Sequence, residues 1–171
     1  MGAMFFSAQL PTISLAKRAS RCILIIVKQE YVEKLIQRIN RKDWWHVTPV
    51  DPSSYSKRGK FLASTYREAE FWGRPNDAPE RVTVENPLIG DEETIECTLL
   101  GRYESGSWPD VDEDIAAGKL FAERRYALDA KLYQAACAKG YDAIVLLSPS
   151  NFAKFKAEGK IPLSIELNLL V

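Results

Sequence analysis

The stretch that decides the expected fold is residues 163–169, Leu-Ser-Ile-Glu-Leu-Asn-Leu. Apolar and polar residues alternate, which predicts a β-strand with Ser164, Glu166 and Asn168 on one face. A carboxylate in the middle of a largely apolar strand is costly to bury unless it has partners. Glu166 therefore lies either on a solvated face or at a site that uses its charge.

The segments before this strand predict a mixture of short strands and helices. Short β-branched, aromatic or alternating runs indicate strands at 22–27, 44–48, 61–64, 81–84, 94–100 and 143–147. Apolar residues at helical spacing indicate helices at 29–41, 65–72, 120–139 and 151–158. Thr65 is the expected N-cap of the second helix, with Glu68 as its capping-box partner. Residues 101–118 are expected to form a loop.

Length and composition indicate one folded domain over residues 1–171. The chain is 46% hydrophobic and 27% charged, as in ordinary globular proteins. No repeat, low-complexity tract or linker divides it. We expect an α+β architecture, in which residues 1–43 are a strand-helix extension of a core at 44–171.

The charge balance and the scarcity of metal ligands exclude some classes of function. The net charge is zero, which argues against a protein that mainly coats nucleic acid or an anionic membrane. Residues 1–42 are strongly basic, either as a solvated helix face or as a surface that faces phosphate or RNA. Three scattered cysteines and one histidine do not have the spacing of a metal site. No apolar run is long enough to span a bilayer, so we expect a cytoplasmic protein without membrane partners.

His46 is the only histidine, and it follows two tryptophans in Trp44-Trp45-His46-Val47-Thr48. A lone histidine beside aromatic residues is either a structural residue with satisfied nitrogens or a functional one. Phe61 and Trp72 bracket the strand, turn and helix that come next. They belong either to the core or to a binding surface.

Taken in order, these segments resemble the ADP-ribosyltransferase-like family. The succession is His46-x-Thr48-Pro49, then residues 59–65 (Gly-Lys-Phe-Leu-Ala-Ser-Thr) running into Ala69-Glu70-Phe71-Trp72. Val84-Glu85-Asn86-Pro87-Leu88 and residues 139–145 (Lys-Gly-Tyr-Asp-Ala-Ile-Val) resemble the second half of such domains. The resemblance spans Trp44 to the end of the chain. It implies a split β-sheet sandwich of short strands with two to three flanking helices.

The resemblance also implies that NAD is the co-substrate and gives a role to individual residues. His46 falls where the family binds a ribose hydroxyl, and Val47 and Thr48 fall where backbone groups hold the nicotinamide amide. Phe61 and Trp72 fall at the two aromatic positions that sandwich the nicotinamide ring, with Ser64 on the turn between them. Glu166 falls at the catalytic glutamate, so Glu166 and His46 are the expected catalytic pair at opposite ends of one cleft.

Some residues depart from the family pattern. Val47 replaces a small glycine, and Phe61 and Trp72 replace more common tyrosines. Ser164, two residues before Glu166, is neither Glu nor Gln, which argues against arginine-directed transfer. These changes bear on efficiency and on the acceptor more than on NAD binding.

The implied activity is NAD-dependent mono-ADP-ribosyl transfer to a protein or nucleic-acid acceptor. A toxin of this kind implies an antitoxin or immunity protein as a further partner. NAD glycohydrolysis, a catalytically silent NAD-, ADP-ribose- or protein-binding module, and a plain α+β interaction domain remain alternatives. No metal is expected to take part.

Overall fold

The structure, a computed structural model, describes residues 27–108 and 115–171. The strand expected at 22–27 lies outside the described residues except for Val27. No helix in the described part of the chain is long and apolar enough to cross a membrane.

Five short strands form one mixed sheet in the order β1-β2-β5-β4-β3. They are β1 (Trp45–His46), β2 (Lys60–Ala63), β3 (Pro87–Gly90), β4 (Ala143–Leu146) and β5 (Glu166–Leu169). The β3–β4 pair is parallel and the other three pairs are antiparallel. The C-terminal strand β5 is therefore the central strand, with β2 on one side and β4 on the other.

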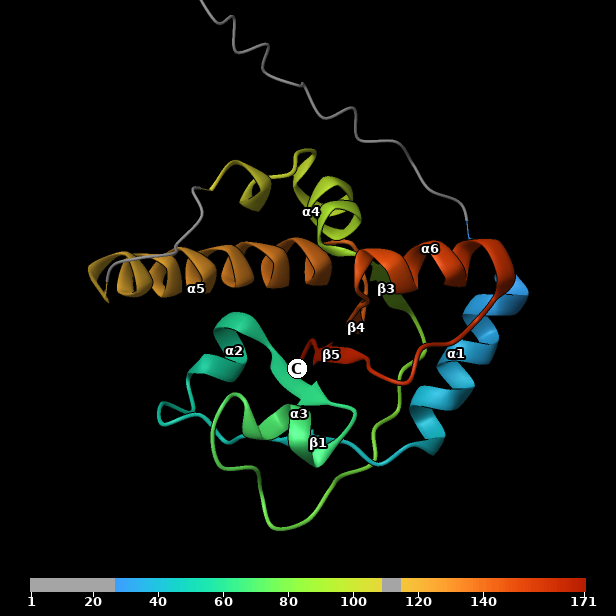
Figure 1. Ribbon diagram of the computed structural model, residues 1–171, viewed down its shortest axis with the longest axis horizontal. Coiled ribbons are helices and arrows are strands. Elements are labelled where there is room, and N and C mark those ends of the chain that lie inside the picture. The colour runs from blue at the N-terminus through green and yellow to red at the C-terminus, as the bar shows by residue number, and fades with distance from the viewer. Residues whose placement is uncertain (1–26, 109–114) are drawn as a thin grey trace, which may run out of the picture.

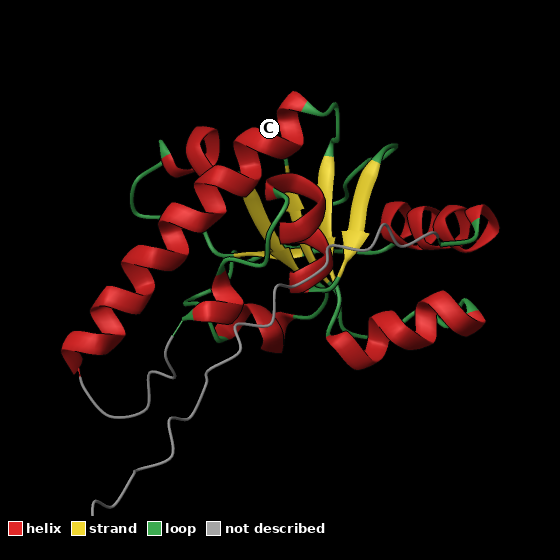
Figure 2. Ribbon diagram, turned by 90° about the horizontal axis from the view of Figure 1, so that it is seen from above, coloured by secondary structure: helices red, strands yellow, loops and turns green. Residues whose placement is uncertain are grey.

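Helices cover both faces of this sheet (Figures 1 and 2). On one face, α4 (Glu92–Leu100) and α5 (Ile115–Ala138) pack through Ile95, Leu99, Leu128 and Leu132 against Leu88 and Ile144. On the other, α1 (Gln29–Arg41) and α6 (Pro149–Glu158) bury Leu35, Ile39, Phe152 and Phe155 against Leu62, Val145 and Leu167. The two apolar clusters are the two sides of one core.

Two short helices border the β1–β2 hairpin. The helix α2 (Ser54–Arg58) precedes β2 and contacts α5. The helix α3 (Tyr66–Glu70) follows β2 and contacts both strands of the hairpin. The hydroxyl of Thr65 accepts a hydrogen bond from the Glu68 amide at 3.2 Å, so the expected N-cap is confirmed.

The expected α+β class is confirmed, but the expected arrangement differs. The described strands form a single sheet rather than a split pair. The described residues also form six α-helices, where helical spacing predicted four and the resemblance implied two to three flanking ones. The helix α1 contributes to the core, because its residues Leu35 and Ile39 are fully buried.

The strand expected at 81–84 does not form. Val82 and Val84 are buried while their neighbours are exposed, so the alternating apolar pattern of this segment matches which side chains are buried. The backbone of Val84 bonds instead to the side chain of Asn40. The Asn40 side-chain nitrogen donates to the Val84 carbonyl, and the Asn40 side-chain oxygen accepts from the Val84 amide. A side chain of α1 thus takes the place of a neighbouring strand.

The strand expected at 94–100 is also wrong, because this segment belongs to the helix α4. Asp91 caps the helix by accepting a hydrogen bond from the Thr94 amide at 3.0 Å. Glu92 and Glu93 lie in the first turn, where their negative charges interact favourably with the helix dipole. Gly101 ends the helix in a left-handed conformation with φ of 73°. These end signals outweigh the strand propensity of the residues between them.

Other elements agree closely with expectation. The helix α1 has the predicted bounds, and the long helix α5 ends just before Gly140, which has φ of 80°. Within the expected loop 101–118, a short 3-10 turn forms at Ser105–Ser107 and α5 begins at Ile115. The helix α6 begins two residues early because Ser148 caps it and Pro149 occupies its first turn.

Candidate functional site

Glu166 begins β5, opposite Ala63 of β2 and Leu146 of β4. This register places its side chain on the sheet face that α4 and α5 cover. Its carboxylate makes no hydrogen bond or ion pair with any described residue. Glu166 is therefore a partly buried acid whose oxygens are free for a ligand.

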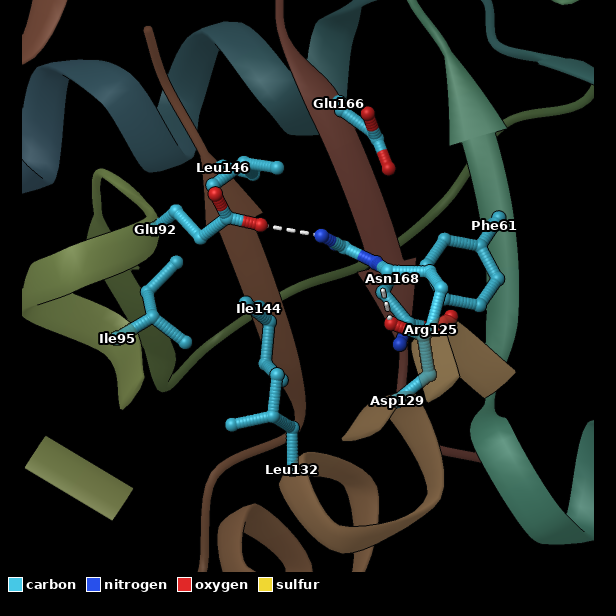
Figure 3. A pocket seen from close by; sticks show the side chains of 10 residues that line it. All are labelled: Phe61, Glu92, Ile95, Arg125, Asp129, Leu132, Ile144, Leu146, Glu166 and Asn168. Atoms are coloured by element: carbon cyan, nitrogen blue, oxygen red, sulfur yellow. Dashed lines mark hydrogen bonds and ion pairs between the residues drawn. The ribbon is translucent and has the colours of Figure 1, made fainter. Parts of the chain in front are cut away.

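A small cavity of about 40 Å³ lies under this face (Figure 3). It has apolar walls, including Phe61 and Ile144, and one charged side that contains Glu92, Arg125, Asp129 and Glu166. Since a buried water needs roughly 10–15 Å³ of such volume, the cavity has room for about three waters. It is too small for a nucleotide.

Arg125 organises the charged side of the cavity. Its guanidinium donates to Asp129 at 3.0 Å, one helical turn further along α5, and to the carboxylate of Glu92 on α4. Figure 3 shows Glu166 projecting from β5 toward the same guanidinium. One cation therefore faces three carboxylates, two of which it bonds directly.

The environment disfavours negative charge on Glu166. Burial raises the pKa of its carboxyl, and the charges of Asp129 and Glu92 raise it further, against the opposing effect of Arg125. Burial also raises the pKa of Asp129. An acid with a raised pKa beside a cavity is a common feature of functional sites.

Glu166 also lines a second, larger hollow of about 390 Å³, which we call the groove. This volume lies within the range of small-molecule sites, about 300–1,000 Å³. Its walls come from the starts of α4 and α6, from Tyr103 and from Ser164. Glu92 and Leu146 line both hollows as well, so Glu166 stands where the groove meets the small cavity.

Arg58 of α2 contacts Asp129 and Asn168, two residues that line the small cavity. It lies 3.8 Å from Asp129, its guanidinium carbon is 4.1 Å from the ring centre of Tyr126, and its carbonyl accepts from Asn168 at 2.8 Å. Gly59 follows with φ of 82°, and a Cβ there would come within 2.3 Å of the Asn168 side chain. This close approach ties α2 to the central strand.

His46 occupies a different place. It pairs with Leu62, which lies on the opposite face of the sheet from Ala63 and Glu166. Its ring is 5% exposed, with Nδ1 2.7 Å from the Phe61 carbonyl and Nε2 2.7 Å from the Tyr55 hydroxyl. A carbonyl can only accept, so Nδ1 carries the proton and Nε2 accepts from Tyr55. Burial lowers the pKa of the imidazole, which keeps it neutral.

The other expected NAD-binding residues make structural contacts. Ser64 is buried and donates to Glu68 at 2.7 Å, while the Thr48 hydroxyl donates to Asn76 at 2.9 Å. Val47 lies next to Gly73. Trp72 is 70% exposed and stacks edge-on against Phe71.

The structure thus brings together only part of the expected constellation. Phe61 and Glu166 line the same small cavity. The remaining expected residues line neither that cavity nor the groove: His46, Val47, Thr48, Ser64 and Trp72. Their roles toward NAD stay predictions.

No family model, curated protein or solved structure matches this chain. The functional argument therefore rests on the residues and their geometry.

The residues that sequence analysis missed are Glu92, Arg125 and Asp129. Arg125 and Asp129 are four residues apart, a spacing at which side chains meet on a helix, and this could have drawn attention to them. Nothing in the sequence links them to Glu92 or Glu166, because α4, α5 and β5 meet only in the tertiary structure. Among the described residues, no group of three or more His, Cys, Asp or Glu side chains is arranged to hold a metal ion.

Proposed function

We propose that this chain is an NAD-dependent mono-ADP-ribosyltransferase in which Glu166 is the catalytic carboxylate. The observation that carries the proposal is the position of Glu166, whose unbonded carboxylate lies where the groove meets the small cavity. The sequence resemblance leads to the same residue independently of this geometry. An ADP-ribosyltransferase-like fold is part of the proposal.

The order of strands supports the proposal as well. The expected first strand, the Phe61 strand and the Glu166 strand lie side by side as β1, β2 and β5. The strand after Gly140-Tyr141-Asp142 lies next as β4, parallel to the strand after Asn86. The segments that carry the resemblance therefore line up around Glu166.

The reaction needs a carboxylate at the ribose. The bond between the nicotinamide nitrogen and C1′ of the ribose breaks, and its electron pair leaves with the nicotinamide. Positive charge builds on the ribose, and a fixed carboxylate nearby lowers the barrier. The acceptor forms the new bond to C1′ and loses a proton to solvent or base.

The charges of the groove suit one orientation of NAD⁺. The cationic nicotinamide ring belongs at the acidic end, beside Glu166, and its positive charge would favour the ionised carboxylate. The phosphates belong at the start of α6, where the first turn contains no acidic residue and Ser148 and Asn151 face the groove.

A second candidate is a catalytically silent binding module on the same fold. The geometry of His46 favours it, because Tyr55 and Phe61 already occupy both ring nitrogens. For His46 to bind a ribose hydroxyl, Tyr55 would have to move away. NAD glycohydrolysis differs from transfer only in that water is the acceptor.

The deciding experiment is a titration of the purified chain with NAD⁺ while nicotinamide release is followed. The test variant is Glu166→Gln, which keeps the shape of the side chain and removes its charge. Glu158→Gln, at the exposed end of α6, is the matched control. We expect release to fall by about 10²–10³-fold in Glu166→Gln, as when a single electrostatic group is removed from an active site, and to be unchanged in Glu158→Gln.

The other outcomes separate the candidates. NAD⁺ binding without nicotinamide release, in the presence of a cell extract that offers acceptors, would select the silent module. Full activity in Glu166→Gln would remove this residue from the mechanism. Absence of both binding and release would overturn the proposal. An antitoxin or immunity partner and a cytoplasmic location belong to the same proposal and depend on a positive result.

A further inference from the structure

The outer side of α1 carries a cluster of cations that the proposed activity does not use. Lys34, Arg38, Arg41 and Lys42, with Gln37, line an open hollow of about 580 Å³. We call these four cations the α1 basic stripe. No residue that lines the small cavity or the groove lies on this helix.

The helix geometry explains why these side chains gather. Positions 34, 38 and 41 follow one another at helical spacings of four and three residues, so they share a face. Leu35 and Ile39 point to the core and are fully buried, which fixes the rotation of α1 and turns the stripe outward. Lys34 and Arg41 are exposed, and Arg38 and Lys42 are half-buried.

The charge of the stripe is not neutralised within the described residues. None of its four cations makes a salt bridge there. The two acids that flank the stripe in sequence bond elsewhere: Glu33 accepts from Gln29 at 3.3 Å, and Asp43 is bonded to Arg81. Burial and the neighbouring charge of Arg38 lower the pKa of Lys42, against the opposing effect of Glu68, as expected where like charges crowd together.

The form of the surface indicates the class of partner. A helix that enters a membrane interface must offer its apolar side to lipid, but the apolar side of α1 is already packed against the sheet. What remains is a row of flexible cations about 12 Å long, since the helix rises 1.5 Å per residue from 34 to 42. Closely spaced phosphates along a polymer match such a row.

We propose that the α1 basic stripe binds the phosphodiester backbone of nucleic acid. The contacts go to phosphates and are therefore independent of base sequence. This inference does not depend on NAD cleavage at Glu166, which lies on a different element and faces α4 and α5. RNA and DNA share the phosphodiester chemistry, and the experiment distinguishes them.

The test measures binding of the full chain to a labelled single-stranded RNA and to a labelled DNA duplex by fluorescence anisotropy over a range of salt. The variant is Lys34→Ala/Arg38→Ala/Arg41→Ala. The matched control is Lys139→Ala/Lys154→Ala/Lys160→Ala, which removes the same charge from exposed positions elsewhere. Alanine has the highest helix propensity, so α1 should persist, and circular dichroism checks this.

We expect wild-type protein and control to bind alike, and the stripe variant to lose at least about tenfold in affinity at low salt. Loss of three phosphate contacts should reduce the slope of log K against log salt by about 2 for single strands and about 3 for duplex. The nucleic acid that the wild-type chain binds more tightly at the same salt concentration is the better partner. If the triple variant does not fold, Lys34→Gln/Arg41→Gln, at the two exposed positions, replaces it.

The inference would be overturned if the wild-type chain bound neither nucleic acid at low salt. It would equally be overturned if the stripe variant bound as well as wild type, or if the control lost as much affinity as the stripe variant. Stripe-dependent binding to vesicles of anionic lipid without binding to either nucleic acid would also overturn it and would assign the surface to membranes.

Discussion

The Nε2 atom of His46 lies 2.7 Å from the hydroxyl oxygen of Tyr55, and this bond joins the first strand to α2. The other ring nitrogen donates to the backbone of the neighbouring strand at Phe61. Because α2 also contacts α5, His46 connects the β1–β2 hairpin to the helix that carries Arg125. The histidine thus has a structural role whether or not it also meets a ligand.

Tyr55→Phe should leave the pKa of His46 below its ordinary value of 6.5, because burial is the largest cause of the lowering and persists in the variant. The loss of a buried hydrogen bond should lower stability by about 1 kcal/mol. NMR titration measures the pKa without ambiguity, since the chain has one histidine. Tyr66→Phe, whose exposed ring has no such bond, is the control and should change neither quantity.

The lowered pKa of His46 also predicts how stability depends on pH. The folded state binds a proton less readily than the unfolded state, so the contribution of His46 is fully present above about 6.5. It is lost as the pH falls from that value through the native pKa. In His46→Gln this dependence should be absent from urea unfolding curves, and its persistence there would assign it to other groups.

Glu166→Gln should be more stable than the wild-type chain at neutral pH. The pKa of Glu166 is raised by burial, so its ionisation opposes folding as the pH rises from 4.5 through the higher native pKa. The variant removes that charge, and we expect a gain of about 1 kcal/mol, typical of a single stabilising substitution. The two proteins should converge in stability at acidic pH. A variant that is less stable at neutral pH would show that the carboxylate has a favourable partner.

Arg125→Leu should destabilise the chain by about 3 kcal/mol, because Asp129, which is 7% exposed, loses its hydrogen-bonded cation and keeps only Arg58, at 3.8 Å. The double variant Arg125→Leu/Asp129→Leu should recover part of this loss, since the most buried carboxylate is removed together with its cation. Arg74→Ala, whose partner Asp77 is fully solvated, should change stability by less than about 1 kcal/mol. Chemical denaturation checks all three variants, and equal losses in the single and double variants would contradict the argument.

Glu96→Ala should loosen the loop that carries Tyr103 into the groove. Glu96 is fully buried and accepts from the Glu104 amide at 2.6 Å, the Ser105 amide at 2.9 Å and the Ser105 hydroxyl. Buried donors left without a partner cost about 1–3 kcal/mol. Hydrogen exchange of the Glu104 and Ser105 amides should accelerate strongly, while the exposed Glu85→Ala leaves them protected. Unchanged exchange would mean that the loop has other anchors.

Much of the fold could be predicted from local signals. The bounds of α1, the alternation of β5 and the Thr65 cap follow from spacing and from hydrogen bonds within a few residues, which the chain makes wherever the segment lies. The errors arose where local signals compete. In α4 the Asp91 cap and Gly101 decided against a strand, and at Val84 a distant side chain, Asn40, took the hydrogen bonds that a strand would use.

The candidate site was predictable only in part. The alternation singled out Glu166 because a carboxylate among apolar residues needs an explanation within its own strand. The cation that faces it comes from α5 and the competing acid from α4, so neither could be inferred from spacing. The sequence also grouped His46 and Trp72 with Glu166, and neither of them lines the small cavity or the groove.

By itself, the sequence determined what each segment could become, since helix spacing, caps and strand alternation depend on contacts within a turn or two of chain. Only the tertiary structure decided which charges meet. The register of β2, β5 and β4 sends Glu166 to the face of Arg125 and His46 to the other, because neighbouring residues of a strand point to opposite sides. A shift of one residue would have exchanged those faces, and that register depends on the packing of the whole core.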